Sequence, residues 1–505
     1  MAFLIKRLKI GELVKVPVRY KQGPNHWATL KKKKTHKDRA LAYFDDFYAK
    51  VYGKSWDDIR TALLQEDNKY IAVVNNFSDA DRIQTVLENH GAINVKSLYD
   101  VFMEDAQERN KKSGKQKKSK KSKELSSRMQ NIISESQMSE IQSVYPTNYE
   151  SPLESLTHEK ENDTVVNAGK PLEPVRMRSI AEDSNNIKED TSRIIVPSEG
   201  LSGLYDFVPA TKLKGMEDWV LESKHYEYYQ KSSDFVVSVQ KENVLPFPKH
   251  LKLYTFEDVS EATFPPPKKG ATGVLDYYLF DGGSVLPVLA LDLQLGDSVL
   301  DMCAAPGGKT LTILQTLMPR LMVANDVMLS RTNRIKKVFQ EYVAGIGQWG
   351  DKFFITQQDA RVIEDKDIYN KILVDVPCTT DRHALHEDDN NIFKPTRIKE
   401  RLQIPEMQAD ILANALKLVT VGGTVVYSTC SLSPIQNDGV VQMALKKVWE
   451  ENNVVIVVKD MSEALHPLQT LFNFGNFGLK YGHIVIPTLQ YNWGPMYFCK
   501  MVKIS

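Results

Sequence analysis

Short apolar runs alternate with helix-like segments through residues 201–505. Each run is rich in Val, Ile, Leu, Met or Phe and leads into small or acidic residues, which is typical of a buried parallel strand. The predicted strands are residues 297–302, 321–324, 353–356, 371–374 and 424–427. Helices are expected from Lys309 onward and over residues 407–418. This alternation predicts an α/β domain with a doubly wound, Rossmann-like parallel sheet.

A smaller folded region is predicted over residues 38–103. Apolar residues recur there at helical spacing, namely Leu41, Phe44, Tyr48 and Val51. The sequence Ser55-Trp56-Asp57-Asp58 is typical of a capping box, which would open a second helix that runs to Leu64. Residues 70–74 are predicted to form a strand. Because no catalytic motif occurs here, we expect a mainly helical accessory region.

The composition changes sharply between residues 104 and 200. Eight lysines lie between Lys111 and Lys123, and Ser, Asn and Glu follow with few aromatic residues. Such a stretch cannot bury enough apolar surface to offset the entropy lost on ordering, so we predict a disordered linker. The lysine run could alternatively hold phosphate groups electrostatically.

The amino-terminal residues 1–37 are basic, with Glu12 as their one acid. Basic and apolar residues alternate there as in a mitochondrial transit peptide. A basic tail that contacts RNA fits the same pattern, and the sequence leaves both interpretations open.

The whole chain has a formal charge of +1 and four cysteines. The scattered cysteines argue against a disulfide framework and favour a reducing compartment. No run of eighteen apolar residues occurs, so no transmembrane helix is expected.

A glycine-rich turn, DMCAAPGGKT, follows the first predicted strand of the sheet. Gly307 and Gly308 would let the backbone approach a ligand closely, and the helix that starts there favours a carboxylate. Cys303 is expected to pack under the turn as a small apolar group. The spacing is not that of a phosphate-binding loop, which argues against a nucleotide hydrolase.

Acidic residues at the ends of the next two strands complete a predicted adenosine site. Asp326 is placed to accept hydrogen bonds from two ribose hydroxyls, and Asp359 suits the adenine amino group. Arg331 is expected to support the wall beside Asp326. In sheets of this kind ligands bind at the carboxyl ends of the strands, where these residues lie.

Two cysteines also follow separate predicted strands, Cys378 after Asp375-Val376-Pro377 and Cys430 after Ser428-Thr429. A thiolate that adds to carbon 6 of cytosine makes carbon 5 nucleophilic enough to take a methyl group, and a base must then remove the carbon 5 proton. Asp375 could bind the cytosine amino group and thereby reject uracil. A lone buried cysteine usually only fills space. Two at strand ends that face one pocket predict methylation of cytosine at carbon 5.

The segments DMCAAPGGKT, VDVPCTTDRHALH and VVYSTCSLSPIQN resemble the Sun-domain RNA cytosine-5 methyltransferases, from about Thr255 to the end of the chain. This resemblance implies an S-adenosylmethionine-dependent enzyme in which Cys430 attacks the base and Cys378 is needed to release the product. The cofactor-binding positions that it implies are Cys303, Ala304, Ala305, Pro306, Gly307, Gly308, Lys309, Asp326, Arg331, Asp359 and Asp375. Ala360 departs from the family pattern, which has glycine after the adenine-binding acid.

Within this family, TTDRHALHEDDNNIF and GPMYFCKM are most similar to the mitochondrial ribosomal-RNA members. The resemblance implies methylation of small-subunit ribosomal RNA in the mitochondrial matrix, a role in ribosome assembly, and a helical partner like the mitochondrial termination factors. The lysine-rich insertion departs from the family pattern. Arg382 and His383 are expected to contact RNA, and His383 and His386 are not expected to bind a metal.

Two other functions stay open. A transfer-RNA cytosine-5 methyltransferase of the same family would use identical chemistry. A non-catalytic assembly factor would keep the fold for RNA binding, although the intact Cys378, Cys430 and Asp375 argue against a loss of chemistry.

Overall fold

The computed structural model of the chain describes residues 34–66, 69–112, 237–256, 264–345, 350–452, 454–475 and 477–505. Residues 1–33 of the predicted basic segment, and residues 113–200 of the predicted linker, lie outside the described residues. Up to Ala106, and again from residue 237 onward, the described residues belong to one compact unit.

A ten-stranded sheet organises this unit. Its strands are β3 Ser238–Lys241, β6 Ser298–Asp301, β7 Leu321–Asn325, β8 Phe353–Thr356, β9 Lys371–Asp375, β10 Thr424–Thr429, β11 Ile456–Asp460, β12 Phe474–Gly475, β13 His483–Val485 and β14 Met496–Lys503. The strands β10-β9-β6-β7-β8 lie side by side and are parallel. They include all five predicted strands, and the doubly wound α/β fold is confirmed. The antiparallel strand β14 extends the sheet beyond β10.

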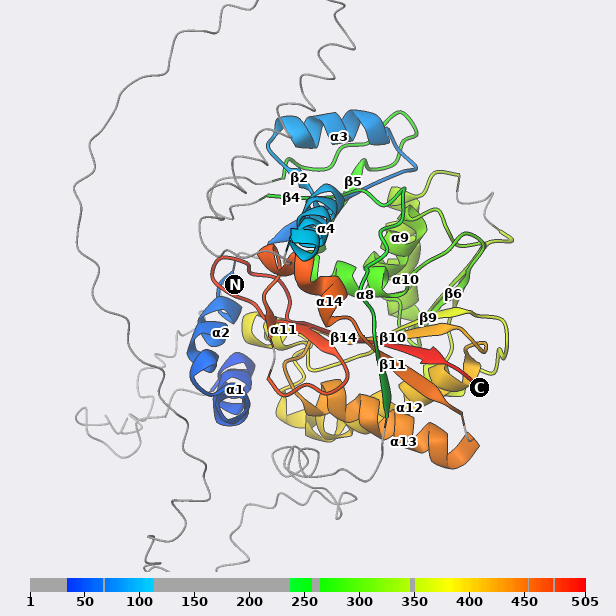
Figure 1. Cartoon of the computed structure of the whole chain (residues 1–505). Coiled ribbons are helices and arrows are strands. Elements are labelled where there is room, and N and C mark those ends of the chain that lie inside the picture. Colours follow the sequence, from blue (N-terminus) through cyan, green and yellow to red (C-terminus); the bar gives the residue numbers. More distant parts are fainter. Residues whose placement is uncertain are drawn as a thin grey trace, which may run out of the picture. The chain divides into compact units, whose positions relative to one another are not determined.

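Helices cover both faces of the sheet (Figure 1). The helices α8 Val285–Ala290, α9 Gly308–Gln315 and α10 Leu329–Tyr342 lie on one side, and α12 Ile398–Leu418 and α13 Val440–Asn452 pack together on the other. Two short helices, α11 Asp381–His386 and α14 Ser462–Leu465, follow β9 and β11. The helix predicted over 407–418 begins earlier, at Ile398, because α12 accommodates Pro405 in its interior. Proline has no amide hydrogen and usually ends a helix, so the turns of α12 before Pro405 were not predicted from the sequence.

The order of the strands fixes where a ligand can bind. β6 lies between β7 and β9, so the chain reverses its direction of winding at this strand. Ligands of doubly wound sheets bind outside the carboxyl ends of the strands at such a reversal. Here those ends carry Asp301 on β6 and Asp375 on β9, with Thr429 ending the next strand, β10.

A second, four-stranded sheet joins the two sides of the predicted linker. Its strands are β1 Tyr70–Val74, β2 Ile93–Asn94, β4 Leu253–Thr255 and β5 Tyr277–Asp281. They pair antiparallel in the order β2-β4-β1-β5, and α3 (Ala80–Asn89) packs on them through Ile83 and Leu87. The region 38–103 therefore supplies half of a sheet as well as helices. Every pairing in this sheet joins a strand that ends by Asn94 to one that begins at Leu253 or later, so the local sequence pattern did not indicate the sheet.

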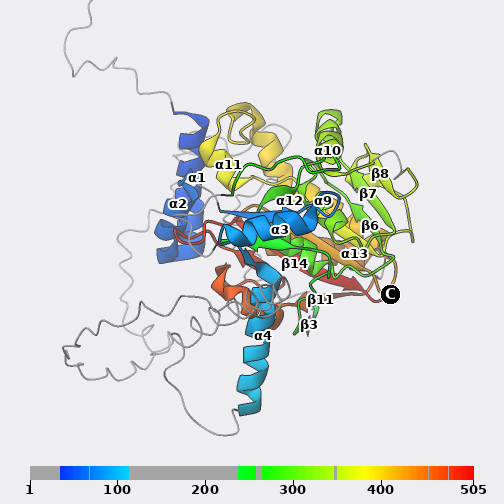
Figure 2. The ribbon, with the colours of Figure 1, turned by 90° about the horizontal axis from the view of Figure 1, so that it is seen from above.

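The first two helices, α1 (His36–Tyr52) and α2 (Trp56–Leu63), pack on the main core. Phe44 of α1 is fully buried, and its ring meets that of Phe393 edge-on with centroids 5.2 Å apart. Both views place α1 beside α11 (Figure 1 and Figure 2). These helices are therefore part of the same hydrophobic core as the large sheet.

The capping of these helices differs from the prediction. Ser55 has a helical backbone and its side chain makes no capping hydrogen bond, because a short 3-10 turn already leads into α2. The capping box forms at α1 instead, where the Thr35 hydroxyl accepts from the Asp38 amide and the Asp38 carboxylate accepts from the Thr35 amide. The last helix of this region, α4 (Val95–Lys112), continues past the predicted boundary at residue 103.

Candidate active site

The glycine-rich turn joins β6 to α9. Gly307 has a φ of 112°, a left-handed conformation that residues with a Cβ rarely adopt. A Cβ on Gly308 would lie 2.7 Å from Cε2 of Phe280, so this position also requires glycine. Cys303 is buried in the turn, and this burial raises the pKa of its thiol well above the ordinary value. Cys303 therefore packs as a neutral group.

Asp326 follows β7 and faces the same turn. Its side chain is 3% exposed, and its Oδ2 lies 3.2 Å from Nε of Arg331. Another guanidinium nitrogen of Arg331 donates to the carbonyl oxygen of Ala305 at 2.9 Å. Arg331 thus ties the acid to the glycine-rich turn. The carboxylate has four acceptor positions, and enough remain for two ligand hydroxyls.

Asp359, which follows β8, is held differently. Its carboxylate accepts hydrogen bonds from Arg361, whose terminal nitrogen lies 2.6 Å from Oδ2. These bonds lower the pKa of Asp359, and its side chain is one-third exposed. A ligand amino group would have to share this carboxylate with Arg361.

Asp375 at the end of β9 links the glycine-rich turn to β10. Its Oδ2 lies 2.8 Å from Nζ of Lys309, and its Oδ1 accepts a hydrogen bond from the Ser428 hydroxyl at 2.7 Å. Burial alone would lower the pKa of Lys309, but the charge of Asp375 raises it above its usual value. Lys309 therefore stays protonated and donates to the Asp375 carboxylate from inside the fold.

The two predicted catalytic cysteines are brought together. The register that pairs Asp375 with Ser428 carries Cys378 and Cys430 to the same edge of the sheet, where their sulfur atoms lie 3.1 Å apart. The contact between the thiols lowers the pKa of Cys378 and raises that of Cys430 well above its ordinary value. The backbone amide of Thr380 also donates to the sulfur of Cys378 at 3.4 Å. The site thus holds one acidic thiol, Cys378, in contact with one that keeps its proton.

Three residues near the cysteines have structural contacts. Arg382 donates to the carbonyl oxygen of Gly494 at 2.9 Å and to Oδ1 of Asn492 at 2.6 Å. His386 contacts the carbonyl oxygen of Leu63 at 2.7 Å, and His383 contacts that of Asp389 at 3.2 Å. These bonds fasten α11 to α2 and to the loop before β14. Among the described residues, no group of three or more potential metal ligands occurs.

The sequence interpretation missed Asp301, the last residue of β6. Its side chain is fully buried, Oδ2 accepts from the Thr310 hydroxyl at 2.6 Å, and Oδ1 has no hydrogen-bond partner. Burial raises the pKa of Asp301 to about 7, against the opposing effect of the Thr310 bond. Its place at a strand end is the same signal that indicated Asp326 and could have identified it.

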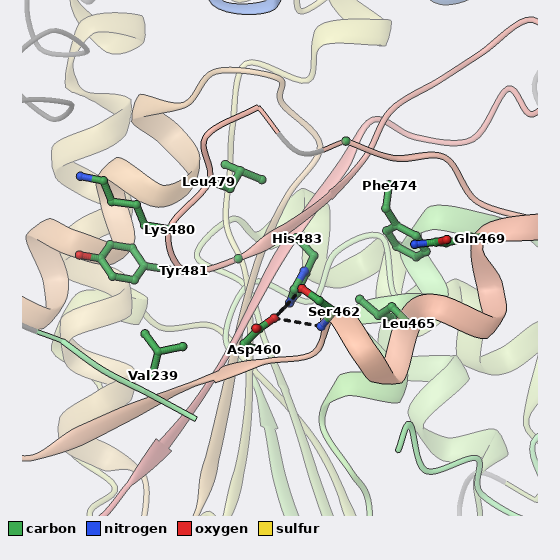
Figure 3. Close-up of a pocket in the computed structure, with 12 residues that line it drawn as sticks. Val239, Asp460, Ser462, Leu465, Gln469, Phe474, Leu479, Lys480, Tyr481 and His483 are labelled. Atoms are coloured by element: carbon green, nitrogen blue, oxygen red, sulfur yellow. Dashed lines mark hydrogen bonds and ion pairs between the residues drawn. The ribbon is translucent and has the colours of Figure 1, made fainter. Parts of the chain in front are cut away.

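A separate cavity of about 350 Å³ lies between β11, α14 and the β12–β13 hairpin (Figure 3). Its polar groups contact one another: the Ser462 hydroxyl donates to Asp460 at 2.6 Å, and the Met461 amide donates to His483 at 3.0 Å. Burial lowers the pKa of His483, so its ring stays neutral. None of the predicted site residues lines this cavity.

No helix in the described part of the chain combines the length and apolar character that crossing a membrane requires.

The fold and the paired thiols define a methyltransferase-like α/β protein, and the comparisons with known proteins identify its family. Residues 288–473 match the family described as 16S rRNA methyltransferase RsmB/F. The 5-cytosine rRNA methyltransferase NSUN4 of Xenopus tropicalis is 34% identical over 509 residues, covering 100% of this chain and 98% of that protein. The chain therefore belongs to the family of 5-cytosine rRNA methyltransferases, and the predicted class of enzyme is confirmed.

Two further matches cover a smaller part of the chain. The mitochondrial tRNA (cytosine(34)-C(5))-methyltransferase of Danio rerio is 38% identical over 242 residues, which are 47% of this chain and 64% of that protein. The crystal structure of NSun6 from Pyrococcus horikoshii matches with a TM-score of 0.36 and 24% identity, covering 46% of this chain and 54% of that one.

The buried carboxyl of Asp301 predicts a pH-dependent stability. Because its folded pKa lies above its usual value, its stabilising contribution is present at low pH and is lost as the pH rises toward 7. The Asp301→Asn variant lacks this titration, so it does not lose this contribution as the wild type does. The unfolding free energy of the variant minus that of the wild type should therefore rise by about 2–3 kcal/mol from pH 5 to pH 8. Chemical denaturation without added cofactor measures this difference. A difference that stays flat with pH would contradict the raised pKa.

Proposed function

We propose that this enzyme methylates carbon 5 of a cytosine in mitochondrial small-subunit ribosomal RNA, with S-adenosylmethionine as the methyl donor. The observation that carries the proposal is the pair of thiols, 3.1 Å apart, at the strand ends beside Asp375. Methylation at carbon 5 requires one group that adds to carbon 6 and a base that removes the carbon 5 proton, and two adjacent thiols supply both.

The residues around the β6–α9 turn fit the proposed cofactor. Gly307 and Gly308 form the tight turn that leads into α9, and the nearly buried Asp326 offers acceptors for the ribose hydroxyls. Asp359 would take the adenine amino group, and Lys309 would help to hold the methionine end beside Asp375. Bound there, S-adenosylmethionine supplies a methyl group on a positively charged sulfur. The remaining predicted contacts are the backbone of Cys303, Ala304, Ala305 and Pro306, and the side chain of Arg331.

In the proposed reaction Cys430 is the nucleophile. The contact between the thiols lowers the pKa of Cys378 and raises that of Cys430, and these directions alone would favour Cys378 as the attacking group. The assignment to Cys430 follows the family resemblance, and the 3.1 Å contact is compatible with it because a deprotonated Cys378 sulfur can accept the Cys430 proton as Cys430 adds to carbon 6. Lys309 lies near Cys430 and stabilises its charge.

The second half of the reaction uses Cys378 again. After carbon 5 has taken the methyl group, Cys378 first loses to solvent the proton that it received from Cys430. The Cys378 thiolate then removes the proton from carbon 5. The electrons of that bond restore the double bond between carbons 5 and 6, and Cys430 leaves as a thiolate. One proton is released in total. Asp375 would orient the base by accepting a hydrogen bond from the cytosine amino group while Ser428 and Lys309 fix its carboxylate.

The choice of ribosomal RNA over transfer RNA as the substrate rests on how much of this chain each relative matches. The similarity to the Xenopus tropicalis enzyme spans the whole chain, whereas that to the Danio rerio transfer-RNA enzyme spans under half. A purely structural role in assembly is disfavoured because the thiol pair and its Lys309–Asp375 support are intact. We further propose RNA and a helical protein like the mitochondrial termination factors as the partners.

The cofactor proposal predicts that Asp326→Ala binds S-adenosylmethionine more weakly while it stays folded. Each lost charge-assisted hydrogen bond to the ribose should cost about 1.5–3 kcal/mol. Titration calorimetry measures the affinity. Asp46→Ala, which removes an exposed carboxylate on α1, should bind as wild type does. Unchanged affinity in folded Asp326→Ala would remove this residue from the proposed site.

The proposed location in the mitochondrial matrix rests on the basic amino terminus, which lies outside the described residues, and on the subfamily resemblance. A fluorescent reporter that carries residues 1–40 should enter mitochondria. The same fusion with Lys6, Arg7 and Lys9 changed to Glu should stay in the cytosol, because import depends on the basic face. A cytosolic wild-type fusion would leave the RNA-contacting tail as the better interpretation.

The roles of the two cysteines predict opposite failures. Cys430→Ala should neither methylate small-subunit ribosomal RNA nor form a covalent adduct with it. Cys378→Ala loses the acceptor of the Cys430 proton together with the contact that raises the Cys430 pKa, so it should attack more slowly, with the proton passing to solvent, and then stall as a protein–RNA adduct on denaturing gels. Cys499→Ala, a buried cysteine in β14, should show neither defect. Adducts from Cys430→Ala but not from Cys378→Ala would exchange the two roles.

A further inference from the structure

Asp381, at the start of α11, has no part in the proposed reaction, yet its buried carboxylate accepts several hydrogen bonds. Oδ2 accepts from the Tyr48 hydroxyl at 2.7 Å and from the Leu432 amide at 2.7 Å. Oδ1 accepts from the Thr379 hydroxyl at 2.5 Å, and the Ser431 hydroxyl lies 3.2 Å from both oxygens. Four groups from three parts of the chain therefore converge on one side chain.

These donors flank the reacting thiols. Thr379 directly follows Cys378, and Ser431 directly follows Cys430. The backbone amide of Asp381 also donates to the carbonyl oxygen of Cys430 at 3.4 Å. Asp381 therefore fastens the segment that carries one thiol to the segment that carries the other. Since each sulfur is within two residues of this network, the spacing of the sulfurs depends on it.

Tyr48 reaches this network from α1, 333 residues earlier in the sequence. It is fully buried, its ring stacks on Phe44 at 4.9 Å, and it meets Trp56 edge-on at 5.4 Å. One turn further along α1, the Tyr52 hydroxyl donates to the carbonyl oxygen of Leu432. Helix α1 thus places two hydroxyl groups against the segment that follows Cys430.

The environment of Asp381 makes these bonds consequential. Burial raises the pKa of Asp381, and the bonds from Thr379, Leu432, Tyr48 and Ser431 oppose that rise. A buried carboxylate that loses a donor must either keep an under-bonded charge or take up a proton. Either response loosens the hold on the two cysteine segments.

We infer that Asp381 and Tyr48 are positioning residues that hold Cys378 and Cys430 at the separation at which one thiol can attack while the other serves as base. The inference rests on the proposed two-thiol reaction. It makes α1, through the Tyr48 and Tyr52 hydroxyls, a support of the active site.

The test compares two tyrosines on one helix. Tyr48→Phe deletes the hydroxyl that bonds Asp381 and keeps the packed ring, whereas Tyr43→Phe deletes a buried hydroxyl that makes no hydrogen bond. Methylation of a small-subunit ribosomal RNA transcript with S-adenosylmethionine gives kcat and KM for each variant. We expect Tyr48→Phe to lower kcat about tenfold with KM unchanged, which corresponds to a net hydrogen bond of about 1.4 kcal/mol. Tyr43→Phe should match wild type.

Two further readouts separate positioning from general stability. Tyr48→Phe should raise the amount of protein–RNA adduct on denaturing gels, because a displaced Cys378 releases the product slowly. Asp381→Asn should show the same defect, and the double variant Tyr48→Phe/Asp381→Asn should be no worse than Asp381→Asn alone. Independent, multiplicative effects would overturn the inference, as would a Tyr48→Phe variant with wild-type kcat and adduct level. Absence of methylation by the wild type itself would instead defeat the proposed function.

Discussion

The parallel pairing of β9 with β10 is the constraint on which the active site depends. The register that sets Asp375 opposite Ser428 brings two chain segments, more than fifty residues apart, to one edge of the sheet. Cys378 follows Asp375 by three residues, and Cys430 follows Ser428 by two. A shift of this register by one residue would turn every side chain of the strand to the opposite face and separate the sulfurs. The core that buries these strands therefore also fixes the chemistry.

Electrostatics adds a second level of control. Lys309, which follows the glycine-rich turn, forms an ion pair with Asp375, and Ser428 of β10 donates a hydrogen bond to the same carboxylate. The residue proposed to hold the cofactor and the carboxylate proposed to bind the base are thus joined in one ion pair. Because this pair is largely sheltered from solvent, its attraction is screened less than that of a surface salt bridge.

The sequence predicted the elements of this site better than their connections. The strands that lead to Asp326, Asp375 and Cys430 could be located because apolar runs and small-residue turns are local signals. The adjacency of Cys378 to Cys430 followed only from the assumption of a common pocket, since strand order is not encoded locally. Asp381 could not be found in this way, because its role depends on donors from α1 and from two loops. The four-stranded sheet was missed for the same reason, as its strands lie on both sides of the linker.

The long span between Tyr48 and Asp381 bears on how the protein is made. During synthesis at about 5–20 residues per second, α1 would wait roughly 20–60 s for the carboxylate that it binds. The strand β1 waits in the same way for β4 and β5 before its sheet can close. A nascent chain therefore exposes the aromatic face of α1 until most of its length has emerged, and it gains a paired set of thiols only near the end of translation. Protection of that face in the interval becomes a requirement of biogenesis.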